Sequence, residues 1–233
     1  MTSNRITRRN LLAGMAGGSV ASFAWLAITA GGGRGRTDPN DAQTAVTDSL
    51  RLTWWETYNG ATLTTSTAST DGGAAAGPAI SLGNVLPGDF GTLTIRLRLD
   101  SETADEVAVK PVLSVSLMGE PRSSGLEEFL DATVWYDTGV FGIDAFGAHN
   151  GERNFGERLV NPDADGTLAD VAAALEDGLV LDPAPFLPGT SCLENDDDVT
   201  ITIGWSFPPE QEHVNAAQGT SVEFDLRFDV EQC

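Results

Sequence analysis

The sequence predicts an all-β protein in which antiparallel sheets pack as a β-sandwich, with one short amphipathic helix. Five segments of eight to eleven residues alternate apolar and polar side chains, and a sixth does so less regularly. Turn-forming Gly, Asn and Pro residues separate several of them. A single segment, 167–178, has helical spacing instead. Because strands with one apolar and one polar face suit sheets that are buried on one side, the pattern favours an antiparallel sandwich.

The final expected strand shows the alternation best, with Val222, Phe224 and Leu226 on one face and acidic residues on the other. Pro111 indicates an edge position or a bulge in its own strand, since proline has no N–H for a ladder. Turns are expected at 59–60, 87–89 and 208–209. The expected strands are 50–58, 92–99, 107–117, 133–141, 199–207 and 221–230.

The expected helix covers about 167–177. Thr167 and Asp170 have the spacing of a capping box, and Gly178 is a typical stop. The apolar residues between them lie at helical spacing; they are Leu168, Val171, Ala172 and Leu175. We expect this helix to lie across a sheet edge or between strands.

The N-terminal residues 1–36 have the composition of an export signal. Arg8 and Arg9 precede a long uncharged segment, which resembles a twin-arginine signal. A retained N-terminal anchor is the alternative, and it would be the chain's only contact with a membrane. Residues 37–49 are then an extended segment, and residues 50–233 form the sandwich domain.

Charge is distributed very unevenly. Residues 37–233 contain 34 acidic and 8 basic residues, a formal charge of −26, whereas residues 1–36 contain five Arg and no acid. Such a charge repels itself in dilute buffer and is screened in molar salt, so we interpret it as a halophile's surface. An ordinary acidic secreted protein is the alternative. Nucleic acid is excluded as a partner, because phosphates require a basic surface.

The chain has two cysteines, Cys192 and Cys233. In an oxidising compartment they are expected to form one intramolecular disulfide, which would hold the C-terminal strand in place. Pairing between chains is the alternative.

Catalytic motifs are missing from the sequence. Residues 210–213 (EQEH) lack the second His of a zinc-protease motif, and no G-x-S-x-G pattern occurs. We therefore predict a non-enzymatic protein without a cofactor. A hydrolase would need a cleft that brings His213 together with Glu210 or other acids.

Calcium is the one metal that the sequence suggests. Asn161, Asp163 and Asp165 follow the spacing of the first half of a calcium loop, and Gly166 comes next. Ala172 stands where a bidentate Glu belongs. The alternative is a polar turn whose acids favour the helix N-terminus. The acidic stretch 194–198 is a second candidate for a cation or for simple solvation.

Four stretches together resemble the TasA/camelysin-like secreted proteins of halophilic archaea, which carry a SipW-dependent-type signal. They are LRLTWWETYNG (50–60), ISLGNVLPGDFGTLTIRLRLD (80–100), DGTLADVAAALEDGLVLD (165–182) and the segment 192–233. The resemblance implies a jelly-roll-like sandwich and an extracellular role as a subunit of fibres or biofilm matrix. It also implies that an N-terminal strand can complete the sheet of a neighbouring subunit.

The sequence therefore predicts a secreted structural protein that self-associates. Ala42, Thr44 and Val46 are the candidate donor-strand residues, although the segment has few apolar side chains to bury. A monomeric surface module that binds a glycan or a cation is the alternative function.

Overall fold

The structure, a computed structural model, describes residues 50–69, 75–99, 108–118, 125–143, 146–187, 192–195, 197–210, 217 and 220–233. The expected export-signal residues Arg8 and Arg9 lie outside this part of the chain. So do the donor-strand candidates Ala42, Thr44 and Val46.

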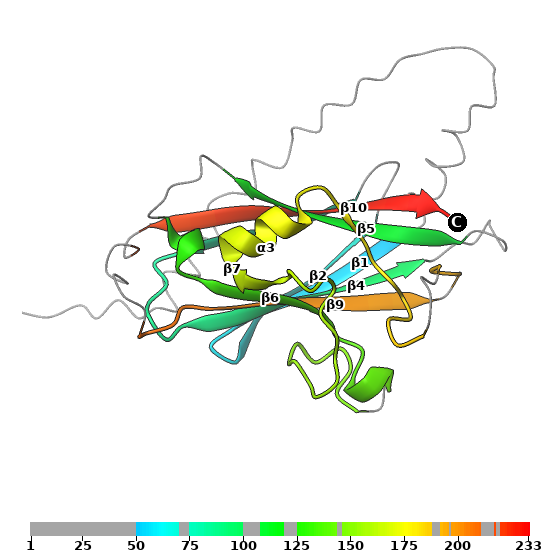
Figure 1. Cartoon of the computed structure of the whole chain (residues 1–233), viewed down its shortest axis with the longest axis horizontal. Helices are drawn as coiled ribbons and strands as arrows, with labels where there is room; N and C mark the ends of the chain where they lie inside the picture. Colours follow the sequence, from blue (N-terminus) through cyan, green and yellow to red (C-terminus); the bar gives the residue numbers. More distant parts are fainter. Residues whose placement is uncertain are drawn as a thin grey trace, which may run out of the picture. The chain divides into compact units, whose positions relative to one another are not determined.

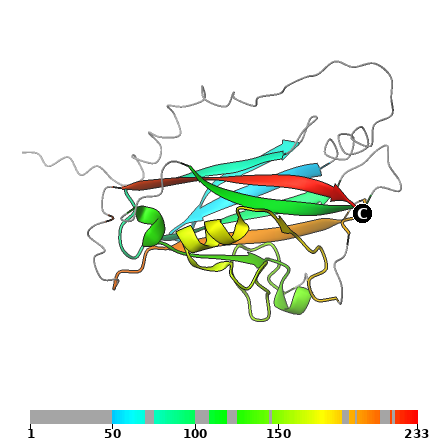
Figure 2. The same ribbon diagram turned by 45° about the horizontal axis from the view of Figure 1, so that its top comes forward.

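The described residues form two antiparallel sheets in two layers, with one α-helix beside them (Figures 1 and 2). The larger sheet has the order β2-β1-β4-β9-β6-β7, and the smaller has the order β3-β10-β5-β8. The larger contains β1 (Leu50–Tyr58), β2 (Ala61–Ser69), β4 (Phe90–Leu99), β6 (Asp131–Tyr136), β7 (Asp165–Thr167) and β9 (Asp198–Ser206). The smaller contains β3 (Ala75–Gly83), β5 (Val109–Met118), β8 (Leu179–Val180) and β10 (Ser221–Gln232). The predicted all-β sandwich is confirmed.

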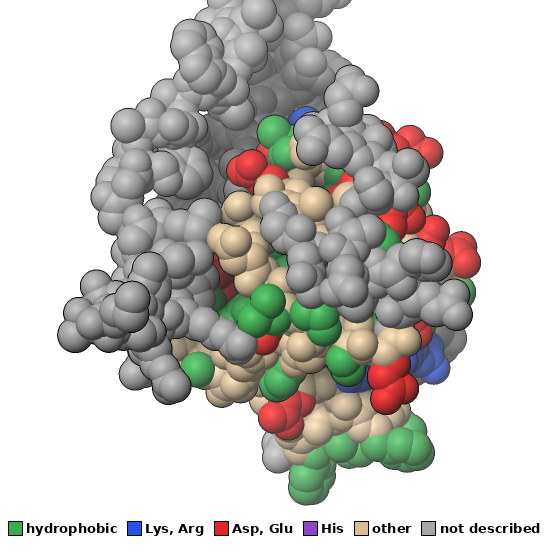
Figure 3. Space-filling model, turned by 90° about the vertical axis from the view of Figure 1, so that its left-hand side faces the viewer, with side chains coloured by type: hydrophobic (Ala, Val, Ile, Leu, Met, Phe, Trp, Pro, Cys, Tyr) green, Lys and Arg blue, Asp and Glu red, His purple; other side chains and the backbone are tan. Residues whose placement is uncertain are grey.

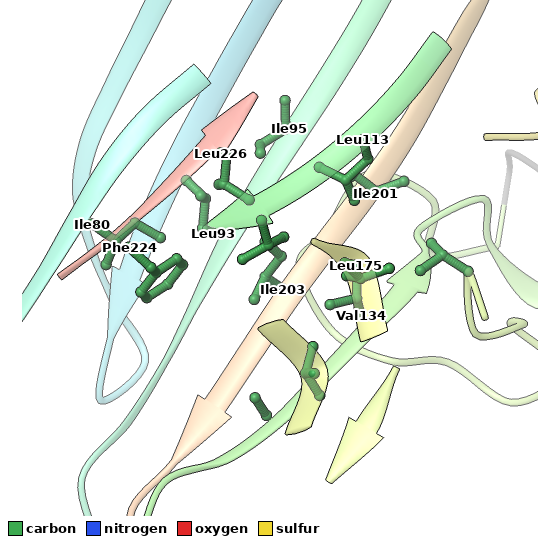
Figure 4. Packing of buried hydrophobic residues seen from close by; sticks show 14 of the residues in the cluster. Ile80, Leu93, Ile95, Leu113, Val134, Leu175, Ile201, Ile203, Phe224 and Leu226 are labelled. Atoms are coloured by element: carbon green, nitrogen blue, oxygen red, sulfur yellow. The ribbon is translucent and has the colours of Figure 1, made fainter. Parts of the chain in front are cut away.

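The core lies between the sheets and is made by the apolar faces that the alternation predicted. Ile95 of β4 and Ile201 of β9 are register partners, and both are fully buried. Phe224 and Leu226 of β10 are also buried and face this core from the other layer (Figure 4). Burying such side chains stabilises the fold by roughly 1.5–3 kcal/mol each.

The predicted helix is α3 (Leu168–Leu175), and its N-cap is Thr167. The capping box is present in both directions, because the Thr167 hydroxyl accepts from the backbone N–H of Asp170 and the Asp170 side chain accepts from that of Thr167. The four predicted apolar residues of the helix are buried. In Figure 1 the helix lies between the two layers, beside β5 and β6.

Two expected turns have clear physical causes. Asn59 and Gly60 both have positive φ (47° and 76°), which the tight β1–β2 hairpin requires. Asp89 ends the second turn with its carboxylate buried. That carboxylate accepts hydrogen bonds from the Tyr58 hydroxyl, the Asn59 amide and the backbone N–H of Leu86. A single acid therefore joins the turn at 86–89 to the hairpin.

Pro111 lies in β5 without breaking it. Its carbonyl accepts from Leu181 N (2.7 Å), on the side where β5 meets only the two-residue β8. Because N–H and C=O of one residue point the same way in an extended strand, the missing donor faces that short side and not the long ladder with β10.

The predicted disulfide joins Cys192 to Cys233, across a sequence separation of 41 residues. The backbone N–H of Cys233 also donates to Ala108 O (3.1 Å). The end of β10 is thus fixed to the segment that leads into β9.

The prediction of a strand over 133–141 is wrong in its second half. β6 begins at Asp131 and ends at Tyr136. The next residue, Asp137, is fully buried and uses its carboxylate to bind the loop backbone, and Gly139 has a φ of 78° that turns the chain away. Residues 137–164 then form a long connection to β7, which we call the excursion.

Candidate functional site

The excursion covers part of the outer face of the larger sheet, which the strand alternation marked as polar. Thr94 of β4 and Thr200 and Thr202 of β9 lie on this face and are buried. Trp135 of β6 is only 3 % exposed there, and its neighbour Leu159 belongs to the excursion. Both faces of this part of the sheet are therefore covered.

Asp137 anchors the excursion to the sheet. Its Oδ2 accepts from Gly151 N (2.8 Å) and from the Thr202 hydroxyl (2.9 Å), and Oδ1 accepts from Asn150 N (3.3 Å). The Thr202 hydroxyl lies 2.8 Å from that of Thr94. A buried carboxylate is tolerated because hydrogen bonds replace its lost solvation.

His149 makes a second attachment to β9. Its Nδ1 lies 2.7 Å from the Thr200 hydroxyl, and its backbone N–H donates to Asp137 O (3.2 Å). His149 has a backbone φ of 58°, which is uncommon for residues other than glycine. The imidazole thus holds the loop against the sheet.

Glu157 organises the outer part of the excursion. Its two carboxylate oxygens accept from Gly139 N (2.8 Å) and Asn154 N (2.7 Å). Burial raises the pKa of this carboxyl above its ordinary value, and nearby Asp137 adds to that direction, while the two backbone hydrogen bonds oppose it.

Large apolar side chains point out of the excursion, although two of its acids, Asp137 and Glu157, are buried. Three of them precede a glycine with positive φ, in the dipeptides Phe141-Gly142, Phe146-Gly147 and Phe155-Gly156. Figure 3 shows hydrophobic side chains on the part of the molecule that projects at the bottom of the view. We call this set the apolar tip: Phe141 (57 % exposed), Ile143 (49 %), Phe146 (61 %), Phe155 (80 %) and the adjacent Leu187 (63 %).

Close contacts hold the apolar tip in shape. Phe141 and Phe155 form an edge-to-face pair with centroids 5.6 Å apart, and a Cβ on Gly156 would lie 2.8 Å from the Phe141 ring. Arg158 lies 5.1 Å from the centre of the Phe186 ring and donates to Pro185 O (2.6 Å). The segment that carries Leu187 is thereby tied to the excursion.

The predicted calcium ligands do not converge on one point through any contact that the structure shows. Asn161 Oδ1 accepts from the backbone N–H of Asp163 (2.9 Å), and Asp165 Oδ1 accepts from the Thr133 hydroxyl (2.8 Å). In the described part of the chain, no group of three or more His, Cys, Asp or Glu side chains is placed to hold a metal. Calcium binding at Asn161, Asp163 and Asp165 stays a prediction.

The other acidic candidates belong to segments outside the excursion. Asp198 forms a bidentate pair with Arg96 (2.7 and 2.9 Å), and Asp197 accepts from the backbone N–H of Glu194 (3.3 Å). Glu210 is exposed, and His213 lies outside the described residues. Within the described ranges, no helix is long and apolar enough to span a membrane.

Sequence reasoning did not find the apolar tip. The available signal was the threefold repetition of Phe-Gly between residues 141 and 156. Isolated exposed phenylalanines carry little meaning, but a glycine in the left-handed region after each one lets the chain reverse and leave the ring outside. Searches of protein-family models, of curated proteins and of solved structures find no match to this chain.

Proposed function

We propose that this chain is a secreted, non-enzymatic structural protein that self-associates as a subunit of an extracellular fibre or matrix. One structural observation carries the proposal: the two sheets end in long, uncharged edge strands on the same side of the sandwich. The resemblance to TasA/camelysin-like proteins supports the same role.

The edge strands β2 and β3 are nine residues each and contain no charged residue. Among the described residues, no strand pairs with their outer sides. Only residues 70–74 separate them in sequence, and β3 contacts β1 across the core, so the two edges are neighbours. Unpaired backbone groups on a long, uncharged edge are a template for another strand, and proteins that stay monomeric usually protect such edges with charge, proline or bulges. In β3, Pro78 removes one N–H, and the other residues of the strand keep theirs.

A strand added to β3 would lie opposite β2 and would extend the smaller sheet over the larger. Trp54 and Glu56 of β1 face this side of the core and are only half-buried. The added strand would cover them further and would gain main-chain hydrogen bonds with β3. In this proposal residues 37–49 of a second subunit, with Ala42, Thr44 and Val46, supply the strand.

Electron microscopy of material sheared from the cell surface in molar salt tests the proposal. We expect filaments whose subunit mass corresponds to this chain without residues 1–36. Dispersed monomers would overturn it and favour a surface module that binds a glycan or a cation.

A pair of variants tests whether the β3 edge is the contact. Ser81 of β3 and Ser116 of β5 are both exposed on the smaller sheet and are paired with acidic residues of β10, Glu223 and Asp225. Ser81→Lys puts a charge on the edge strand and should abolish filaments. Ser116→Lys adds the same charge on β5, which β10 separates from β3, and should leave the filaments intact. Filaments in both variants would contradict strand addition at β3.

A further inference from the structure

The inner face of β1 carries an acid. Trp54 and Glu56 are register partners of Ile95 and Leu93, which are buried between the sheets. Because register partners point to the same side of a sheet, both side chains face the core. Tyr58, two residues further along, packs against the core as well. From Trp54 to Tyr58 this face therefore reads aromatic, acid, aromatic.

This part of the inner face is incompletely covered. Leu50 and Leu52, at the start of β1, are at most 1 % exposed, whereas Trp54, Glu56 and Tyr58 are all partly exposed. β3 contacts β1 across the core, and among the described residues no strand pairs with the outer side of β3. The proposed strand addition to β3 would therefore place a new strand over these three side chains.

The Glu56 carboxylate needs a partner when it is covered. Within the part of the chain that the structure describes, it forms no hydrogen bond or ion pair. Burial already raises the pKa of this carboxyl above its ordinary value. Burying a carboxylate further is costly unless hydrogen bonds replace its lost solvation. A strand that covers this face must therefore bring a hydrogen-bond donor to Glu56.

The candidate donor segment has the complementary pattern. Ala42, Thr44 and Val46 would share one face of an added strand, because side chains alternate along it. They read apolar, hydroxyl, apolar, with the same two-residue spacing of roughly 6.6 Å as the three side chains of β1. Neither Ala nor Val is large, which leaves room for the Trp and Tyr rings. Because Thr44 is central, the match holds whether the donor runs parallel or antiparallel to β3.

We infer that Glu56 of one subunit recognises Thr44 of the next. The Thr44 hydroxyl donates to the Glu56 carboxylate in a charge-assisted hydrogen bond, and the two apolar residues beside Thr44 pack on the aromatic rings. A slip of two residues along the donor would put an apolar side chain against the carboxylate and leave it buried without a partner, so the pair also fixes the register. This inference rests on the proposed strand addition and names the contact that makes it selective for this segment.

A double-mutant cycle across the contact between subunits tests the pair. The full chain is studied in molar salt, and the critical concentration for filament formation is measured by sedimentation and electron microscopy. Thr44→Val keeps the shape of the side chain but removes the hydroxyl, so it should raise the critical concentration at least about fivefold. In a Glu56→Met background, where no carboxylate needs a donor, the same change should leave the critical concentration unaltered.

Thr47→Val is the matched control. It removes the same hydroxyl three residues along, where the alternation places the side chain on the opposite face of an added strand. The critical concentration of this variant should equal that of the wild type. Melting temperatures of the monomers should match as well, and Glu56→Leu replaces Glu56→Met if that variant melts early.

The possible failures can be told apart. A wild-type chain that stays monomeric would overturn strand addition and this inference together. Wild-type filaments with a normal critical concentration in Thr44→Val would overturn the inference alone. Equal effects of Thr44→Val with and without Glu56, or equal losses in Thr44→Val and Thr47→Val, would do the same. If Thr44→Val lowers the melting temperature of the monomer, the segment binds within its own subunit and the contact between subunits is wrong.

Discussion

The sandwich core and the excursion place their side chains in opposite ways, and the excursion is the region that reverses the usual placement. In the sandwich, apolar residues such as Leu97 are fully buried between the sheets, and polar residues of the strands lie on the outer faces. In the excursion, Asp137 and Glu157 are buried while Phe146 and Phe155 are exposed. The core is held by apolar burial, and the excursion by carboxylates that accept backbone N–H groups. A loop organised by internal acids can present apolar side chains outward without collapsing onto them.

The largest contrast should come from truncating one apolar residue in each region. Leu97→Ala leaves a cavity between the sheets and should lower the free energy of unfolding by about 3 kcal/mol. Phe155→Ala removes a larger side chain but should change it by less than about 0.5 kcal/mol, since the ring is 80 % exposed. Urea unfolding in molar salt measures both. If the two variants lost equal free energy of unfolding, the apolar tip would be part of the core.

Removing the Asp137 carboxylate should have the next largest effect on the free energy of unfolding. Asp137→Ala leaves two backbone N–H groups and the Thr202 hydroxyl without their acceptor and should cost about 2–3 kcal/mol. Asp163 is an exposed acid of the same excursion, and Asp163→Ala should cost less than about 0.5 kcal/mol. Hydrogen exchange of Gly151 N checks the mechanism, because its protection should be lost only in the Asp137 variant.

The smallest effect is the pH dependence due to Glu157. Its pKa is raised in the folded chain, so the folded state retains this proton to a higher pH than the unfolded state does. Its contribution to stability is therefore most favourable below the ordinary value of 4.5 and declines as pH rises through the raised value. Glu157→Gln has no carboxyl at this position, so its free energy of unfolding should lack this decline with pH. The free energy of unfolding of the wild type, relative to the variant, should fall as pH rises above 4.5, and a difference that rises would refute the assignment.

The sequence predicted the core better than the excursion, for a physical reason. Alternation in residues 92–99, 199–207 and 221–230 reports burial on one face, and these strands formed with the expected faces inward. The capping box at Thr167 and the disulfide are local chemical patterns, and both are present. Asp137 shows where this kind of prediction fails. Its carboxylate is buried because Gly151 and Thr202 donate to it, and alternation along one strand does not reveal such distant partners.

The candidate site was missed for a related reason. The polar and acidic residues of 161–165 and 194–198 are easily chosen as candidates from sequence, because their side chains are typical metal ligands. Phenylalanine is most often a core residue. At Phe141 and Phe155 the exposed ring goes with a positive φ at the following glycine, and Phe141 itself has a φ of 54°. The backbone conformation decided the orientation of these side chains, and sequence patterns report that conformation mainly through glycine and asparagine.

The pairing of β4 with β9 also sets how the chain must fold. Ile95 and Ile201 are neighbours in the sheet although more than one hundred residues of chain separate them. Such distant partners must be brought together before their contacts compensate the entropy of loop closure, so folding should be slow, on a scale of milliseconds to seconds. Until β9 and β10 dock, the uncharged strands β2 and β3 belong to incomplete sheets and are open to wrong partners. Mutual repulsion between strongly acidic chains would then keep folding intermediates apart.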